Sequence, residues 1–291
     1  MMQFGVSYNT ALYGVDPDAV VALARHAEQC GFESFYVPEH IALYPGAAVG
    51  PIAFPPALPI ADPLACLTFV AAATERIVLG TGVLLLPHRH PVVLAKELAT
   101  IDVLSKGRMR LLTVGLGSLP GEAAAVGVDF HTRGRRADEA IDVLRLLWAG
   151  DEDGVSFDGE FFSFERLCSF PKPHRVSTLP IHVGGSSDAA ARRAGLRGEG
   201  YFPGGRLSSD QRAAQIALMR TTARAAGRDA DVLQYTRWGA IDMSPEDVAA
   251  HAARGTTRLV VGPSSTDPVQ QRDELSAFAE RLGLASTSGA A

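Results

Sequence analysis

The chain has 291 residues, of which 47% are apolar and 20% charged, and its formal net charge is −5. No basic run is longer than Arg133-Gly134-Arg135-Arg136, which argues against a nucleic-acid surface. No apolar stretch approaches the roughly 18 residues that span a bilayer, and no signal peptide is expected. We therefore expect one globular domain over residues 1–284, followed by a frayed tail at 285–291.

The three cysteines, Cys30, Cys66 and Cys168, are few and far apart. Their spacing matches neither a disulfide framework nor a set of metal ligands. His88-Arg89-His90 offers two histidines, but no third metal ligand is evident. We therefore expect a cytoplasmic protein without a metal site.

Apolar segments alternate with helical periodicity through the first half of the chain. Asp-Pro pairs at residues 16–17 and 62–63 each begin a helix, because Asp caps the first turn and Pro is tolerated there. Long loops are predicted at 41–61, which is rich in proline, and at 116–132. The predicted strands are 3–7, 32–37, 77–86 and 109–115, and the predicted helices are 17–30, 62–74, 91–105 and 133–149.

The second half continues the alternation after an insertion. Residues 155–164 alternate apolar and polar side chains around Asp158-Gly159, which predicts a short β-hairpin with a two-residue turn. The remaining predicted strands are 180–183, 200–203, 232–241 and 258–261, and the remaining helices are 187–194, 208–226, 244–254 and 267–282.

Eight strands, each followed by a helix, predict the α/β class and a (β/α)8 TIM barrel with insertion loops and a short β-hairpin. The strands near residues 80 and 110 are apolar on both faces, as in a parallel sheet covered by helices. No Gly-x-Gly-x-x-Gly motif occurs at a strand-to-helix turn, so a doubly wound dinucleotide fold is less favoured.

The active site of such a barrel lies at the carboxyl ends of the strands, where the sequence offers several candidates. Pro38-Glu39-His40 follows the second strand, and histidine can act as an acid, a base or a donor near neutral pH. A histidine that only caps the next loop fits that position equally well. Gly80-Thr81-Gly82-Val83 leaves room for a flat ring against the backbone, or for a closely packed helix.

Two further glycine-rich segments follow later strands. Gly115-Leu116-Gly117-Ser118 ends the fourth strand and precedes Glu122. A single acidic residue on a loop is usually exposed to solvent, so this is the expectation for Glu122. Gly184-Gly185-Ser186-Ser187 leads into a helix, where convergent N–H groups and the helix dipole favour a phosphate. A simple serine cap is the alternative.

Charged and titratable side chains lie near two of these segments. Arg133, Arg135 and Arg136 open the fourth helix, an unfavourable end for cations. We expect them to pair with Asp138 and Glu139, although an anionic ligand group is the alternative. His88 and its neighbours follow the third strand and are placed at the mouth of the site.

These motifs resemble the luciferase-like monooxygenase superfamily, in order, over about residues 2 to 262. Within it, Glu39-His40 and the Pro-rich loop look most like the branch that depends on the deazaflavin coenzyme F420. The other motifs are Gly80-Thr81-Gly82-Val83, Pro91 with Ala95-Lys96-Glu97, Asp102-x-Leu104-Ser105-x-Gly107-Arg108, Val114-Gly115-x-Gly117, Arg133 and Arg135 with Glu139, Leu144-x-x-Leu147-Trp148, Phe157-x-Gly159-x-x-Phe162, Pro171-x-Pro173 and Pro180-Ile181-His182-Val183-Gly184-Gly185.

The resemblance implies a TIM barrel that binds F420 or FMN at its carboxyl face. It implies a non-proline cis peptide at Gly82-Val83, behind the tricyclic ring. It assigns His40, Glu39 and Glu122 to the catalytic group. It assigns Thr81, Gly82, Val83, Gly117, Ser118, Gly184, Gly185, Ser186 and Ser187 to cofactor binding, the last four at the phosphate. Ser118 stands where the family's sugar-phosphate dehydrogenases carry a glutamate, which argues against a sugar-phosphate substrate.

The resemblance leaves three functions open. The first is an F420-dependent oxidoreductase that moves a hydride to or from a small organic molecule, with residues 41–61 as a lid. The second is an FMN-dependent monooxygenase, which would need a flavin reductase as partner. The third is a barrel that binds a flavin or deazaflavin without catalysis. The resemblance also implies a homodimer, for which the apolar face of residues 64–73 is suited.

Overall fold

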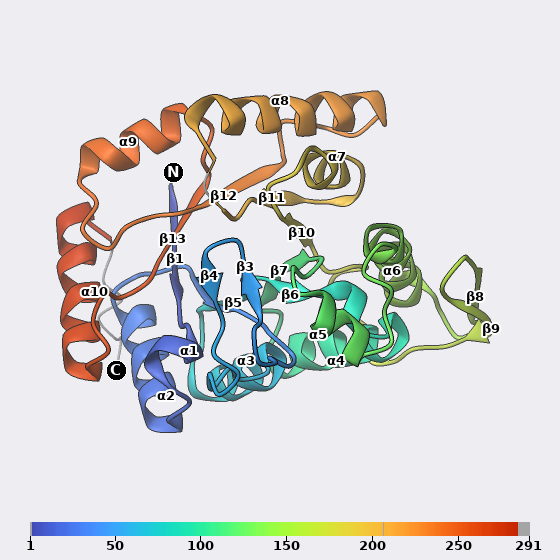
Figure 1. Cartoon of the computed structure of the whole chain (residues 1–291), viewed down its shortest axis with the longest axis horizontal. Helices are drawn as coiled ribbons and strands as arrows, with labels where there is room; N and C mark the ends of the chain where they lie inside the picture. Colours follow the sequence, from blue (N-terminus) through green and yellow to red (C-terminus); the bar gives the residue numbers. More distant parts are fainter. Residues whose placement is uncertain (1, 206, 285–291) are drawn as a thin grey trace.

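A computed structural model describes residues 2–205 and 207–284, so the predicted tail at 285–291 lies outside the described residues. Its central sheet is a closed ring of eight parallel strands, because β10 pairs with both β11 and β7. The strands of the ring are β1 (Gln3–Ser7), β2 (Ser34–Val37), β5 (Val78–Thr81), β7 (Met109–Gly115), β10 (Ile181–Gly184), β11 (Gly200–Phe202), β12 (Gln234–Trp238) and β13 (Arg258–Val261). The predicted (β/α)8 barrel is confirmed (Figure 1).

A helix follows each strand of the ring and lies outside it. Asp16, Asp62 and Asp267 cap three of these helices, each with proline in the first turn. Serine caps α7, α8 and α9. The covering helices are α2 (Pro17–Gln29), α3 (Pro63–Ala73), α4 (Pro91–Leu104), α6 (Arg133–Ala149), α7 (Asp188–Arg197), α8 (Ser209–Ala225), α9 (Pro245–Ala253) and α10 (Pro268–Leu282).

The apolar core has separate inner and outer parts. Tyr36, Leu111, Phe202 and Val260 fill the inside of the barrel. The larger part lies between the strands and helices α2, α3, α4, α6 and α10. A satellite cluster, which includes Tyr235, lies between β10–β12 and helices α7 and α8.

The predicted third strand is two pieces. After β5 the chain makes a bulge, and β6 (Leu84–Leu85) then pairs with β7 before a short 3₁₀ helix, η1 (Leu86–His88). The register of β5 against β7 also shifts at Leu79 and Gly80. The continuous apolar run hid this break, because strand propensity does not report a change of direction.

The connections hold more structure than the sequence predicts. Loop 116–132 contains a helix, α5 (Pro120–Ala125), and another short helix, α1 (Thr10–Tyr13), follows β1. The Pro-rich loop contains a small hairpin of β3 (Ala48–Val49) and β4 (Ile52–Ala53). The predicted hairpin is present as β8 (Val155–Asp158) and β9 (Ser163–Leu167), but Asp158 pairs with Ser163, so its turn is longer than two residues.

Candidate active site

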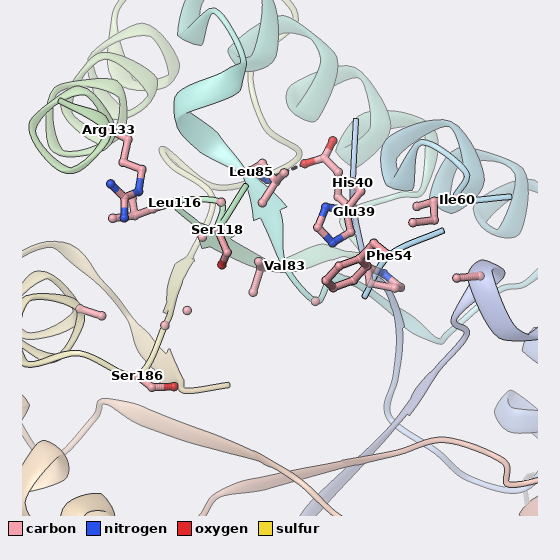
Figure 2. Close-up of a pocket in the computed structure, with 18 of the residues that line it drawn as sticks. Glu39, His40, Phe54, Ile60, Val83, Leu85, Leu116, Ser118, Arg133 and Ser186 are labelled. Atoms are coloured by element: carbon pink, nitrogen blue, oxygen red, sulfur yellow. Dashed lines mark hydrogen bonds between the residues drawn. The ribbon is translucent and has the colours of Figure 1, made fainter. Parts of the chain in front are cut away.

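A cavity of about 650 Å³ lies at the carboxyl ends of the barrel strands. Most of the predicted site residues line it: Glu39, His40, Gly82, Val83, Gly117, Ser118, Gly184, Gly185, Ser186 and Ser187. Figure 2 shows Val83 near the centre, with His40 and Phe54 on one side and Ser118 and Arg133 on the other. The cavity therefore brings together segments that follow five different strands.

The floor of the cavity is the bulge after β5. The Gly82–Val83 peptide is cis, as the resemblance implies. The Val83 side chain lies between two glycines: a Cβ atom at Gly115 would be 2.5 Å from Val83 Cγ2, and one at Gly184 would be 2.7 Å from Val83 Cγ1. Glycine at these two positions is therefore required for Val83 to occupy the floor.

Thr81 lies outside the residues that line the cavity. Its hydroxyl donates to the Thr113 carbonyl at 2.8 Å and accepts from the Thr113 amide at 2.9 Å. The side chain is fully buried between neighbouring strands. Its predicted contact with a cofactor stays a prediction, since both hydrogen-bonding functions of the hydroxyl are already used.

His40 is held from one side by a buried carboxylate. Its Nδ1 lies 3.1 Å from Glu122 Oε2, and the backbone amides of Ile41 and Ala42 donate to Glu122 Oε1 at 2.5 and 3.3 Å. The Phe54 ring lies 4.9 Å from the imidazole, centroid to centroid. Glu122 therefore fixes both the ring and the start of the loop that carries it.

Glu122 is only 1% exposed, although the sequence placed it on a solvated loop. Helix α5 carries the side chain inward, and this helix is the feature that the sequence did not show. Burial alone would raise the pKa of Glu122, but the hydrogen bonds from His40, Ile41 and Ala42 outweigh it and lower the pKa below its ordinary value.

Glu39 is turned away from His40 and toward the backbone after the bulge (Figure 2). It accepts from the Leu85 amide at 2.5 Å and from Arg89, whose Nε lies 3.1 Å from Glu39 Oε1. Arg89 also bonds Asp62, the cap of α3. Burial raises the pKa of Glu39, while the Arg89 charge opposes that rise. The geometry thus makes Glu39 a group that fixes the bulge, and its predicted catalytic role stays a prediction.

The glycine-rich segment after β10 begins helix α7. The Ser187 hydroxyl caps this helix by accepting from the Ala190 amide at 3.2 Å. Gly185 has φ +102°, which only glycine adopts without strain. Ser186 donates to the Gly204 carbonyl, and Gln215 of α8 donates to the Ser186 carbonyl at 2.5 Å. The turn is therefore rigid, and the N-terminus of α7 faces the cavity.

Arg133 does not form the ion pair that the sequence predicts. Asp138 binds Arg193 instead, and Glu139 accepts from the Phe161 and Phe162 amides. Arg133 lines the cavity, with its guanidinium 3.6 Å from the centroid of the Phe130 ring. Its buried Nε has no hydrogen-bond partner in the described part of the chain. The alternative, an anionic ligand group, fits this placement.

The neighbouring arginines do not pair with Asp138 and Glu139 either. Arg135 binds Glu160 of the β8–β9 turn at 2.8 Å, and Arg136 donates to the Pro87 carbonyl at 3.1 Å. Sequence proximity suggested local pairs, but the partners come from distant segments: the inserted hairpin for Arg135 and η1 for Arg136.

His88 is not at the mouth of the site. It is 8% exposed, and a Cβ at Gly117 would lie 2.9 Å from its Cε1. Burial lowers its pKa. Both ring nitrogens lack a partner among residues 2–205 and 207–284. His88 therefore stands behind the Gly117 wall as a neutral side chain.

The apolar side of the cavity comes from residues that sequence reasoning did not single out. They belong to α1 and to the Pro-rich loop, which was expected to be a lid: Ala11, Phe54, Leu58 and Ile60. Asn9, the cap of α1, also lines the cavity. Only the position of the loop after the second strand hinted at these contacts.

No group of three His, Cys, Asp or Glu side chains in the described part of the chain could hold a metal ion. Within the same residues, no helix has both the length and the apolarity to cross a membrane.

Known proteins share this sequence pattern. The family described as luciferase-like monooxygenase matches residues 2–256. An uncharacterized protein of Mycobacterium tuberculosis (strain H37Rv) is 31% identical over 97% of this chain and 97% of its own length. An F420-dependent glucose-6-phosphate dehydrogenase of Beutenbergia cavernae is 32% identical and aligns with 85% of this chain and 76% of its own.

Solved structures share the fold. An F420-dependent secondary alcohol dehydrogenase in complex with an F420–acetone adduct superposes with a TM-score of 0.81, at 19% identity, over 97% of this chain and 98% of the other. Monooxygenase RslO1 from Streptomyces bottropensis gives a TM-score of 0.76 at 21% identity, with the same coverage of both chains. At these identities the likeness establishes the barrel and not the chemistry.

Proposed function

The chain belongs to the luciferase-like monooxygenase family, and from this premise we propose that it is an F420-dependent oxidoreductase acting on a small, uncharged organic substrate. The observation that carries the proposal is His40, held by the buried Glu122 beside a glycine-lined floor. Two relatives at 32–33% identity are F420-dependent glucose-6-phosphate dehydrogenases, which supports the deazaflavin over FMN.

The cavity fits a tricyclic ring with an anionic chain. Gly115 and Gly184 leave the Val83 floor free of other side chains, so a flat ring can approach the backbone. The turn at Gly184–Ser187 would hold the phosphate at the start of α7. Arg133, with its unpartnered Nε, would hold a further anionic group of the chain. When bound, the deazaflavin supplies the hydride chemistry.

His40 would move the proton that accompanies the hydride. The Glu122 carboxylate can only accept, so His40 donates to it from Nδ1. In a neutral imidazole the single ring hydrogen is therefore on Nδ1. Nε2 then has a free lone pair and can accept the proton of a substrate alcohol. In the reverse direction, a protonated His40 returns that proton to the carbonyl oxygen. Glu122 orients the ring and stabilises the imidazolium that forms.

The substrate side of the cavity favours an uncharged molecule. Ala11, Phe54, Leu58 and Ile60 surround the approach to His40, and among the described residues the one arginine or lysine that lines the cavity is Arg133, on the opposite side (Figure 2). Ser118 lines it where the resemblance places a glutamate in sugar-phosphate dehydrogenases. We infer that alcohols, aldehydes, ketones or enones are better candidates than a sugar phosphate.

Parallel titrations of the protein with F420 and with FMN, read by fluorescence, test the cofactor. We expect saturable binding of F420 and turnover of at least one uncharged alcohol or enone. Binding of FMN alone, with oxygen consumption when a reductase is added, would replace the proposal by the two-component monooxygenase. F420 binding without turnover of any such substrate would favour the non-catalytic barrel.

His40→Ala tests the proton-transfer role. We expect kcat to fall about 10²–10⁴-fold, while the dissociation constant for F420 stays unchanged. His131→Ala removes an exposed histidine and is the matched control. Equal turnover of His40→Ala and the wild type would end the assignment of His40 as acid–base group.

A further inference from the structure

A second cavity, of about 260 Å³, lies outside the barrel between α8, α9 and β12. We call it the α8–α9 cleft. Figure 1 shows the two helices following one another along the outer side of β12. Tyr235 and Arg237 line the cleft from alternate positions of that strand, while Trp238 faces the other way and contacts Phe202. The cleft is therefore separate from the cavity that holds His40.

The lining of the cleft is strongly basic. Arg212 from α8, Arg237 from β12 and Arg254 at the end of α9 all line it, and among the described residues Asp210 is the one carboxylate that does. No ion pair joins any of the three guanidinium groups to a carboxylate in residues 2–205 and 207–284. Burial and the charges of these three arginines together lower the pKa of His251, which also lines the cleft. The described lining therefore carries an excess of positive charge.

Several polar atoms in the cleft are buried without a hydrogen-bond partner. They are Nε and Nη1 of Arg237 and the hydroxyl of Tyr235, a residue that is 3% exposed, within the described chain. A buried polar atom left without a partner destabilises the folded protein, because it has lost its hydrogen bonds to water. The buried Arg258 shows the usual arrangement, because it binds Glu33, Gln234 and Gln3 through all three guanidinium nitrogens.

We propose that the α8–α9 cleft is an anion-binding site for a phosphate or carboxylate group that carries at least two negative charges. Arg237 presents two free donors, Nε and Nη1, on different edges of its guanidinium; the Tyr235 hydroxyl adds a third, and Arg212 and Arg254 supply further positive charge. A neutral ligand would leave three guanidinium charges unmatched, so the anion is the ligand that this lining selects.

The anion has two chemical sources. One is a free phosphate or polycarboxylate. The other is the anionic tail of a cofactor bound in the first cavity, because helix α8 connects the two places. Gln215, near Arg212 on α8, donates to the Ser186 carbonyl in the predicted phosphate turn and accepts from Tyr201. This second source rests on the proposed function, whereas the site itself does not.

Isothermal titration of the cofactor-free protein with pyrophosphate tests the site. We expect one saturable site, and we expect Arg237→Gln to weaken it by about tenfold or more. Arg192→Gln removes an exposed charge on α7 and should leave the affinity unchanged. Heats equal to those of sodium chloride at matched ionic strength, or equal affinity of Arg237→Gln and the wild type, would overturn the proposal.

Two further variants keep the test decisive. Tyr235→Phe removes only the hydroxyl and should weaken pyrophosphate about threefold. If Arg237→Gln does not fold, Arg254→Gln at the exposed end of α9 replaces it, with the same expected direction. A wild-type affinity in both Tyr235→Phe and Arg254→Gln would place any pyrophosphate binding elsewhere.

F420 preparations with short and long oligoglutamate tails separate the two sources. If the tail occupies the cleft, Arg237→Gln weakens long-tailed F420 more than short-tailed F420, and long-tailed F420 competes with pyrophosphate. If the ligand is a free anion, the variant weakens pyrophosphate alone. Failure of F420 to bind would contradict the proposed function and leave the pyrophosphate result standing by itself.

Discussion

Two charged regions of the barrel differ in whether their buried polar groups have hydrogen-bond partners. In the His40 wall, which we define as Glu39, His40, Arg89 and Glu122, each carboxylate accepts from at least two donors of the protein. In the α8–α9 cleft, Nε and Nη1 of Arg237 and the hydroxyl of Tyr235 are buried atoms without a hydrogen-bond partner in the described chain. The protein itself therefore completes the first region, and the second depends on a group from outside.

This difference separates two uses of a buried charge. Where the protein supplies every partner, the geometry is fixed before any ligand arrives, as a proton-transfer group requires. Where the partners are missing, the free energy of the unpaired groups is recovered only on binding. His88 is an intermediate case, since it is unpartnered but stays neutral because burial lowers its pKa.

The largest effect is expected when the His40 wall loses a charge. Glu39→Ala leaves the guanidinium of Arg89 largely buried, with only the more exposed carboxylates of Asp62 and Glu97 close to it among the described residues, and we expect the free energy of unfolding to fall by about 3 kcal/mol. Urea unfolding measures this. Glu160→Ala, which breaks the exposed pair with Arg135, should leave the unfolding midpoint unchanged. Equal midpoints for the two variants would refute the difference between them.

Removing a charge from the α8–α9 cleft should change the free energy of unfolding in the opposite direction. Arg237→Met removes a half-buried cation whose buried Nε and Nη1 have no hydrogen-bond partner in the described chain, so without ligand the free energy of unfolding should rise by about 1 kcal/mol. Arg258→Met, at a buried arginine with a full set of partners, should lower it by about 3 kcal/mol. Thermal unfolding in a buffer without phosphate compares the two. A loss of stability in Arg237→Met would mean that the protein already satisfies this side chain.

The sequence predicted the barrel because the relevant signals are local. Alternation of apolar segments with capped helices gave all eight strands, and the Ser and Asp caps located the helix starts to within a residue or two. The break between β5 and β6 escaped, since a cis peptide and a bulge leave no trace in hydropathy. Only the family resemblance indicated Gly82–Val83.

The site was predictable where glycines and His40 mark strand ends, and less so where partners lie far along the chain. Glu122 reaches His40 only because α5 turns it inward, and PGEAAA lacks the apolar period that would have shown a helix. Asp138 binds Arg193, which is 55 residues away in the sequence. Because that carboxylate already has a partner, Arg133 does not pair with it and lies in the cavity instead. The α8–α9 cleft joins α8, β12 and α9, and no sequence motif links them.

The smallest effect concerns the pH dependence that Glu122 gives to the His40 wall. Its pKa is lowered in the folded protein from an ordinary value of 4.5, so the carboxylate stabilises the fold above pH 4.5, and this contribution is lost as the pH falls through the lowered pKa. Glu122→Gln lacks it. The free energy of unfolding of the wild type should therefore exceed that of Glu122→Gln by about 1 kcal/mol near pH 6, and this difference should shrink toward pH 3. Urea unfolding of both proteins across this range measures it. A difference that stays constant with pH would show that Glu122 is not held as a carboxylate, and the hydrogen on Nδ1 of His40 would then lose its physical basis.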